Sequence, residues 1–212
     1  MIRIVSLSLR VTGIALLVST LVGIPLGSWL GLRRFIGRQL VIALLYTGMG
    51  FPPVVVGLFV YLMLSRSGPL GSLGWLFTPA AMIVAQVIIS FPLVSGFTMA
   101  AVMGVDPNLR QQVLSLGATD WQATLAVLRE ARVGVIVSMI AGFGSIISEV
   151  GAVMLVGGNI QGSTRVLTTA IVLETRKGNF DLAMALGIVL LTLSFLANVA
   201  MLRLQGRAFE SE

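Results

Sequence analysis

The sequence predicts an all-α integral membrane protein with five transmembrane helices per subunit. Of its 212 residues, 57% are hydrophobic and only 10% are charged, whereas soluble globular domains carry about 25% charged residues. Five stretches are each apolar over the length of about 20 residues that a helix needs to cross a bilayer. The intervals between them are too short for a soluble domain. We therefore expect residues 1–212 to form a single transmembrane domain.

The first predicted span runs from about Val11 to Leu32 and contains no charged residue. Along one of its faces, small residues recur at every fourth position, namely Ala15, Ser19, Gly23, Gly27 and Gly31. In membrane helices this spacing is typical of a face that packs closely against another helix. Because Gly is also common in membrane helices generally, simple abundance is the alternative explanation.

The second and third predicted spans contain prolines. The second runs from about Leu40 to Leu64 and holds Pro52 and Pro53, and the third runs from about Trp75 to Gly104 and holds Pro92. A proline inside a helix removes a backbone donor and bends the helix. Bent helices suit a bundle that encloses a cavity better than they suit a simple anchor.

The fourth span, from about Val133 to Val156, holds Glu149, the one ionisable side chain deep in a span. Such a group is commonly functional and finds a partner inside the protein. Because a carboxylate repels anions, we expect Glu149 to fix a gate by bonding to backbone groups or to Arg165. A plain contact between helices is the alternative. The fifth span runs from about Leu182 to Leu202.

An odd number of spans places the two termini on opposite sides of the membrane. Basic residues concentrate in cytoplasmic loops, and the short loop after the first span carries Arg33, Arg34 and Arg38. We therefore predict that the N-terminus lies outside and the C-terminus inside. This orientation places the polar segment 105–132 in the cytoplasm and segment 157–181 outside.

Segment 157–181 is predicted to be an outer gate. Its middle part, from Thr164 to Glu174, is apolar enough to enter the membrane interface and too short to cross the bilayer. Ser163 is a suitable N-cap for a short helix there. We expect a re-entrant or interfacial helix, with an ordinary surface helix as the alternative.

The polar segment from Val105 to Arg132, called the elbow below, is the most informative part of the chain. Asp106, followed by a proline, suits the start of a short helix. Gly117 can end that helix in the left-handed conformation, and Thr119 with Gln122 forms a capping-box pattern for a second helix. The sequence thus predicts two short helices at an angle, available to a soluble partner. A merely long cytoplasmic loop is the alternative.

The chain lacks the residues on which most enzyme chemistry depends. It has no Cys and no His, which excludes thiol chemistry, the usual zinc sites and imidazole catalysis. It also has no G-x-x-x-x-G-K-[ST] loop for nucleotide phosphates. Its 14 basic residues are scattered between apolar spans, which argues against nucleic acid as a partner. We predict no catalytic residue, no metal and no cofactor on this chain, which leaves a channel, a secondary transporter, the membrane half of a driven pump, or a non-transporting scaffold.

The elbow resembles the coupling segment of ABC importer permeases. That family's pattern opens with Glu-Ala-Ala, continues with three residues, Gly and nine further residues, and closes with Ile-x-Leu-Pro. Here Gly117 and the apolar Val127 match. The opening positions are instead Gln111, Gln112 and Val113, and the Leu-Pro ending is absent.

Other blocks are similar to molybdate-type permeases and follow in the same order along the chain. They are IPLG at 24–27 with RRFIGR at 33–38, FPPVVVG at 51–57, SFPL at 90–93, and SEVGA at 148–152. Three stretches are most similar to the tungstate-specific branch: LREAR at 128–132, EVGAVMLVGGN at 149–159, and TRVLTTAIVLETRKG at 164–178.

The resemblance implies a type I ABC importer permease in the cytoplasmic (inner) membrane of a prokaryote. It further implies a homodimer, two ABC ATPase subunits that bind ATP and Mg²⁺ and dock on the elbows, and an extracytoplasmic protein that delivers the oxyanion. Tungstate is the implied cargo, with molybdate or sulfate as alternatives. A stand-alone channel or secondary transporter is a more distant alternative. Moving a dianion into a negative cytoplasm costs about 2.3 kcal/mol per charge per 100 mV, so uptake needs an energy source.

Two groups of candidate site residues follow. The residues expected to couple the elbow to the ATPase are Gln111, Gln112, Leu116, Gly117, Ala118, Thr119 and Trp121. The residues expected to line the translocation path or gate offer hydroxyls, an amide or a charge: Ser145, Ser148, Glu149, Asn159, Thr164, Arg165, Thr168 and Thr169. Among these, Arg165 supplies attraction for an anion.

Overall fold

The computed structural model describes residues 1–209, with side chains described as far as Arg203. Its elements are α1 (Ile2–Leu32), α2 (Arg38–Met49), α3 (Pro53–Leu64), the 3-10 helix η1 (Gly71–Leu73), α4 (Pro79–Met103), α5 (Pro107–Ser115), α6 (Asp120–Glu130), α7 (Arg132–Ile147), α8 (Gly151–Gly157), α9 (Leu167–Arg176) and α10 (Phe180–Phe209). No strand occurs in this described range, so the all-α prediction is confirmed for it.

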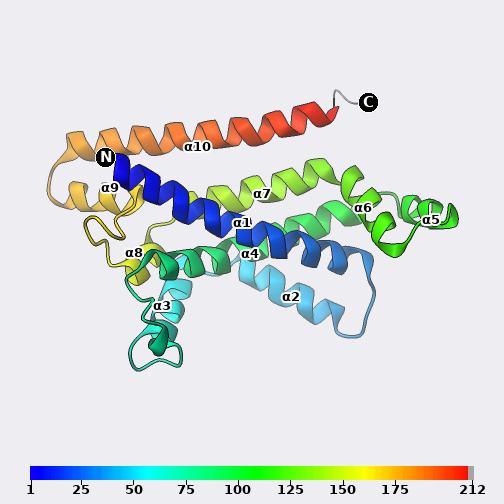
Figure 1. The fold of residues 1–212 in the computed structure, drawn as a ribbon, viewed down its shortest axis with the longest axis horizontal. Coiled ribbons are helices and arrows are strands. Elements are labelled where there is room, and N and C mark those ends of the chain that lie inside the picture. The colour runs from blue at the N-terminus through cyan, green and yellow to red at the C-terminus, as the bar shows by residue number, and fades with distance from the viewer. Residues whose placement is uncertain (210–212) are drawn as a thin grey trace.

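The centre of the bundle is α4, which packs against α1 (Figure 1). A Cβ atom added to Gly27 of α1 would lie closer to the backbone oxygen of Ser95 than real Cβ atoms come, and two other glycines of the same face lie against valine side chains of α4. On that face, Ser19 also shares a buried 2.6 Å hydrogen bond with Ser90. The face of small residues therefore lets the two helices approach closely, as its spacing predicts.

Within the described residues, α1, α4 and α10 are each long and apolar enough to cross a membrane. Two further spans result only if α2 with α3, bent by 102°, and α6 with α7, bent by 72°, each count as one. The structure thus gives between three and five spans, and the predicted five is its upper limit. The first helix is longer than predicted, since it begins at Ile2 and not near Val11. A helix of this length can extend its polar end beyond the hydrocarbon core.

Two of the spans predicted to be continuous are broken. The break between α2 and α3 falls immediately before Pro53, which has no backbone N–H with which to continue a preceding helix. In the fourth predicted span, α7 ends at Ile147 and α8 begins at Gly151. Glu149 therefore lies in a break between two helices and not inside one. By contrast, α4 continues as one helix through Pro92.

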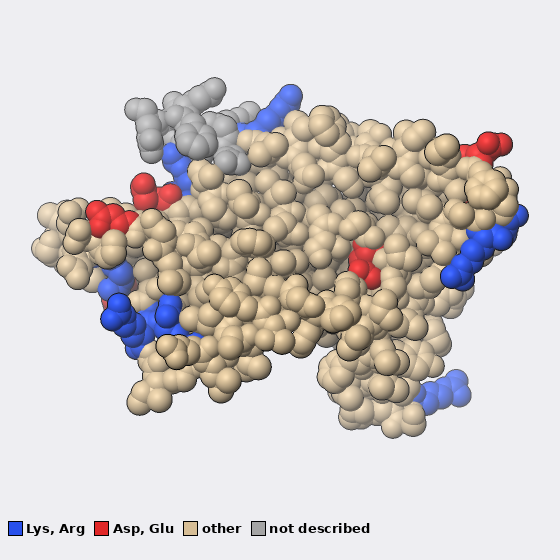
Figure 2. Space-filling view, turned by 180° about the vertical axis from the view of Figure 1, so that it is seen from behind, with Lys and Arg blue, Asp and Glu red and all other residues tan. Residues whose placement is uncertain are grey.

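The bundle has two distinct ends. The elbow helices α5 and α6 lie at one end, together with the end of α1 and the start of α2 (Figure 1). The N-terminus, α8 and α9 lie at the opposite end, and α10 runs from that end back toward the elbow. Charged side chains gather mainly at these two ends, and the broad surface between them is uncharged apart from an acidic group (Figure 2). This distribution is what a chain that crosses a bilayer along its long axis requires.

Candidate functional site

The elbow consists of α5 and α6 joined at Gly117. The Asp106 side chain accepts a 2.9 Å hydrogen bond from the backbone N–H of Asn108 and so caps α5. Gly117 has a φ of +87°, in the left-handed region that ends helices. The Thr119 N–H donates to Gln122 Oε1 at 2.8 Å, and the Gln122 N–H donates to Thr119 Oγ1 at 3.3 Å, which completes a capping box on α6. The two helices and their caps are those that the sequence predicts.

The elbow exposes two large apolar side chains. Leu116 is 87% exposed and Trp121 is 68% exposed. The other residues expected to couple to an ATPase surround them, with Gln111, Gln112, Gly117 and Thr119 exposed and Ala118 half-buried. Exposed Leu and Trp side chains with polar neighbours are typical of a surface that binds another protein.

A single carboxylate ties the elbow to the first helix. Asp120, the first residue of α6, accepts a 3.0 Å hydrogen bond from Arg33, which directly follows α1. The same carboxylate accepts a second hydrogen bond from Arg110 of α5. The hydrogen bond from Arg33 and the charge of that guanidinium hold the pKa of Asp120 below its ordinary value of 3.8. This three-residue contact, called the clasp below, joins α1, α5 and α6 at neutral pH.

The clasp is not predictable from the sequence patterns described above. Arg33 and Asp120 are 87 positions apart in the chain, and no recognisable sequence motif contains the two residues together. The only available signal was that both lie in segments predicted to face the same side of the membrane.

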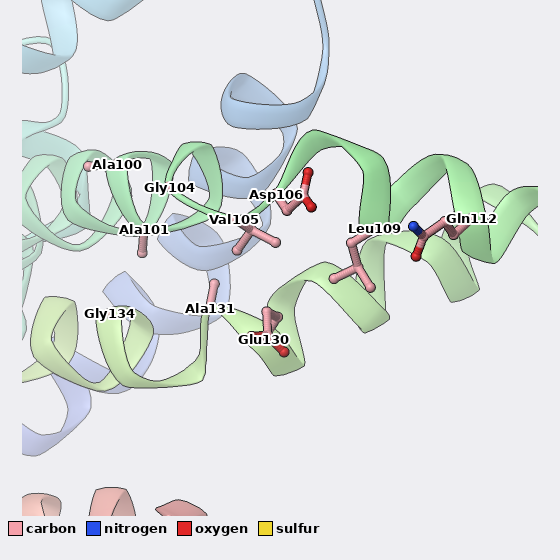
Figure 3. A pocket seen from close by; sticks show the side chains of 10 residues that line it. All are labelled: Ala100, Ala101, Gly104, Val105, Asp106, Leu109, Gln112, Glu130, Ala131 and Gly134. Atoms are coloured by element: carbon pink, nitrogen blue, oxygen red, sulfur yellow. The ribbon is translucent and has the colours of Figure 1, made fainter.

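A pocket of about 560 Å³ lies between the end of α4, the elbow and the start of α7 (Figure 3). Its lining includes five small residues, namely Ala100, Ala101, Gly104, Ala131 and Gly134. Asp106 before α5 and Glu130 at the end of α6 add two carboxylates, and Gln112 contributes its amide (Figure 3). The pocket is large enough for side chains of a partner, and its carboxylates favour basic ones.

At the far end of α7, Glu149 holds the break together. Its Oε1 accepts a 2.9 Å hydrogen bond from the backbone N–H of Ala152, in the first turn of α8. Its backbone carbonyl accepts a 2.9 Å hydrogen bond from Thr168 Oγ1 of α9. Of the two kinds of partner expected for this carboxylate, the structure has the backbone group, whereas Arg165 bonds elsewhere. Glu149 thereby connects the break to both α8 and α9.

A small polar cavity of about 10 Å³ adjoins Glu149 and Thr168, and the sequence reasoning missed its other polar residues, which are Ser8, Thr12 and Gln86. Gln86 is only 4% exposed, and its Nε2 donates a 3.1 Å hydrogen bond to a backbone carbonyl of α7. Its Oε1 has no hydrogen-bond partner among the described residues. Burying an unpaired amide oxygen is costly. A single Gln in the apolar third span could therefore have indicated a polar cavity at this position.

Three other predicted gate residues, Asn159, Thr164 and Arg165, lie together in the turn between α8 and α9. Thr164 Oγ1 accepts a 3.0 Å hydrogen bond from the Ile160 N–H and donates to the Gly157 carbonyl. Arg165 Nε donates a 3.3 Å hydrogen bond to Asn159 Oδ1. Asn159 has a φ of +51°, which is uncommon for a residue with a side chain. The turn is therefore fixed by several side chain–backbone hydrogen bonds.

The predicted N-cap at Ser163 is wrong, since α9 begins later, at Leu167. The hydroxyl that serves its first turn is that of Thr169, which accepts a 3.1 Å hydrogen bond from the Val166 N–H. The structure thus divides the predicted gate residues into two groups. Ser145, Ser148, Glu149 and Thr168 lie at the break, and Asn159, Thr164, Arg165 and Thr169 lie in or beside the turn.

One helix connects the elbow to the break. α6 ends at Glu130 and α7 continues from Arg132 to Ile147 after a bend of 72°. At 1.5 Å per residue, the 16 residues of α7 span about 24 Å. α7 therefore runs from the elbow to the break as one uninterrupted helix.

The described residues contain no group of three or more acidic side chains that could hold a metal.

Comparison with known proteins assigns the family. Residues 23–209 match the family described as "binding-protein-dependent transport system inner membrane component". The chain is 44% identical over 212 residues to a probable anion ABC transporter permease protein of Haloferax volcanii, covering 98% of this chain and 91% of that protein. It is 41% identical over 202 residues to the tungstate uptake system permease protein TupB of Peptoclostridium acidaminophilum, covering 95% and 89%. A solved structure of the MetNI methionine ABC transporter has the same fold, with a TM-score of 0.77 over 98% of this chain and 95% of that chain at 18% identity. The chain therefore belongs to the family of inner-membrane components of binding-protein-dependent transport systems.

Proposed function

We propose that this chain is the non-catalytic, membrane-spanning subunit of an ATP-driven importer for tungstate or a closely related oxyanion. The elbow carries the proposal, because it is a capped pair of helices that exposes Leu116 and Trp121 in a chain without a nucleotide-binding loop. The similarity to a tungstate uptake permease supports the cargo.

The proposed assembly contains two copies of this chain in the cytoplasmic membrane of a prokaryote. Each copy crosses the membrane five times, with the N-terminus outside and the C-terminus inside. Two ABC ATPase subunits, which bind ATP and Mg²⁺, dock on the elbows, and an extracytoplasmic protein delivers the oxyanion to the opposite end. The location of the N-terminus at the end opposite the elbow supports this orientation (Figure 1), as do Arg33 and Arg34 at the elbow end.

The proposed coupling path runs along α7. The ATPase displaces the elbow, α7 carries that displacement to the break, and the hydrogen bonds of Glu149 to α8 and α9 change the position of the outer gate. Hydroxyl and amide groups of the gate residues then face the passing anion, with Arg165 as the attracting charge. Glu149 positions the gate and does not bind the anion, because its carboxylate would repel it.

An external energy source is needed on physical grounds. Importing a dianion against 100 mV costs about 4.6 kcal/mol, at about 2.3 kcal/mol per charge. A passive pore would release the anion from the cell. The ATPase partner therefore supplies the free energy of uptake.

Reconstitution tests the proposal. The chain is purified with its ATPase, placed in liposomes with the binding protein, and assayed for uptake of radiolabelled tungstate in the presence of unlabelled tungstate, molybdate or sulfate. We expect uptake that requires ATP and the ATPase and is inhibited best by tungstate. Uptake without the ATPase would instead indicate a channel or secondary transporter, and stronger competition by molybdate or sulfate would change the cargo.

A further inference from the structure

The loop 65–78, between α3 and α4, is ordered and apolar but largely exposed. It contains η1, and its Leu70 N–H donates a 2.9 Å hydrogen bond to the Met63 carbonyl at the end of α3. Four large apolar side chains of the loop are 41–47% exposed: Leu70, Leu73, Trp75 and Phe77. Its one charged residue is Arg66, and it contains no acidic residue. A loop in water is expected to be more polar than this.

The position of this loop along the chain fixes its depth relative to a bilayer. Trp75 and Phe77 immediately precede α4, which begins at Pro79 and is long and apolar enough to span. The 25 residues of α4 extend about 37 Å, at 1.5 Å per residue. Because a hydrocarbon core is about 30 Å thick, the ends of α4 reach the headgroup regions. With α4 placed across a bilayer, Trp75 and Phe77 come to lie near the boundary between hydrocarbon and water, at the end of the bundle opposite the elbow.

The exposed apolar surface of the loop continues that of α3. One side of α3 packs on α8, with Val56 and Val60 in the same buried cluster as Val153. The other side exposes a row of apolar residues, which are Val54, Val55, Leu58, Phe59 and Leu62. α3 turns away from α2 by 102° and projects from the side of the bundle, with the loop at its tip (Figure 1). The projection thus presents a continuous apolar face beyond the long helices.

The loop is also fixed to the gate. The Phe77 N–H donates a 2.9 Å hydrogen bond to the Val156 carbonyl of α8. The Phe77 ring packs so closely on Gly158 that an added Cβ there would lie 2.9 Å from Phe77 Cδ1, and it meets the Tyr61 ring edge-on at 6.2 Å between centroids. Phe77 has a φ of +61°, a strained conformation for an aromatic residue, which these contacts hold in place.

We propose that loop 65–78 is an interfacial anchor that inserts the side chains of Leu70, Leu73 and Trp75 into the phospholipid headgroup region on the side opposite the elbow, while Phe77 packs on Gly158 and Tyr61. Trp and other aromatic residues are enriched at that depth, and Arg66 can face lipid phosphates. A surface for a soluble partner would carry a polar rim around its apolar centre, whereas this surface continues into the apolar side of α3. The anchor gives the gate a fixed point, because Phe77 bonds directly to α8.

Tryptophan fluorescence tests the anchor directly. The chain has three Trp residues, so replacing Trp29 and Trp121 by Phe leaves Trp75 as the only tryptophan, which is excited selectively over tyrosine. The matched control replaces Trp29 and Trp75 by Phe and keeps Trp121 on the elbow. Both variants are reconstituted, and their folding is checked by circular dichroism. Quenching is then measured with lipids brominated near the headgroup, with lipids brominated near the chain end, and with aqueous iodide.

We expect Trp75 to be quenched more strongly by the shallow bromines than by the deep ones, and several-fold less by iodide than Trp121. Iodide quenching of Trp75 equal to that of Trp121 would overturn the proposal, because the loop would then lie in water. Resistance of Trp75 to both bromolipids and iodide would also overturn it, since the loop would then be covered by protein. Neither result depends on uptake, so the test is independent of the transport proposal.

Discussion

Replacing Gly117 by Ala should uncouple ATP hydrolysis from uptake and leave the protein folded in the membrane. Gly117 has a φ of +87°, and a Cβ atom added there meets no atom within 4 Å, so the cost arises from backbone conformation and not from a clash. A left-handed residue with a side chain costs about 1–2 kcal/mol. The angled elbow should therefore become about 5–30-fold less populated relative to other geometries, and coupled uptake should fall by a similar factor.

Gly37 provides a matched control. It has a φ of +90° and nothing within 4 Å of an added Cβ, and it lies at the same end of the bundle, directly before α2. Replacing Gly37 by Ala should thus cost the same conformational free energy without changing the elbow. Uptake and ATP hydrolysis are measured together in proteoliposomes for both variants. Equal ratios of uptake to hydrolysis in the two variants would contradict the coupling role assigned to Gly117, as would normal coupling in the Gly117 variant.

Three further predictions concern the packing, the clasp and the break. Replacing Gly27 by Ala should destabilise the protein by about 1–3 kcal/mol through overpacking against α4, measured by unfolding in detergent, whereas the same change at Gly13, which meets nothing within 4 Å, should not. Replacing Arg33 by Gln should loosen the elbow, seen as faster hydrogen exchange in α6. The pKa of Asp120 is lowered in the folded protein, so the clasp is fully formed above the unfolded value of 3.8 and is lost as the pH falls through the lower folded value. The difference in hydrogen-exchange rate between this variant and the unchanged protein should therefore vanish only below about pH 3.8. At the break, Glu149→Ala should destabilise the protein by about 0.5–2 kcal/mol, as loss of a helix cap does. Glu149→Gln should retain most of the stability, because it keeps an acceptor oxygen. Equal thermal stability of the two variants would contradict the hydrogen bond between Glu149 and the Ala152 N–H.

Features that depend on neighbours in the chain could be predicted from the sequence. The elbow is such a feature. Asp106, Gly117 and the Thr119–Gln122 pair begin or end its helices through contacts with residues a few positions away in the chain. The face of small residues on α1 also follows from a fixed spacing along one helix, and the structure places it against α4. In both cases local stereochemistry determines the result, so no knowledge of the tertiary structure was needed.

Features that depend on distant segments could not be predicted in this way. Hydropathy gave a continuous fourth span, but the chain breaks at Glu149, where hydrogen bonds to α8 and α9 replace those of a helix. The N-cap of α9 was misplaced because Ser163 lies in the turn before the helix, where its N–H donates to the Ile160 carbonyl, and the sequence does not show this turn. The clasp and the cavity beside Gln86 join segments from opposite halves of the chain, and hydrophobic periodicity carries no information about such pairs.

The most direct test of the account is to identify what touches the tip of the elbow in the assembled transporter. Because the chain has no Cys, a single Cys at Leu116, which is 87% exposed, can carry a photoactivatable cross-linker. A Cys at Leu70, at the opposite end of the bundle, provides the comparison. We expect the Leu116 position to cross-link to the ATPase subunit and the Leu70 position not to do so. Capture of the ATPase from Leu70, or cross-links from Leu116 only to helices of its own chain, would contradict this expectation.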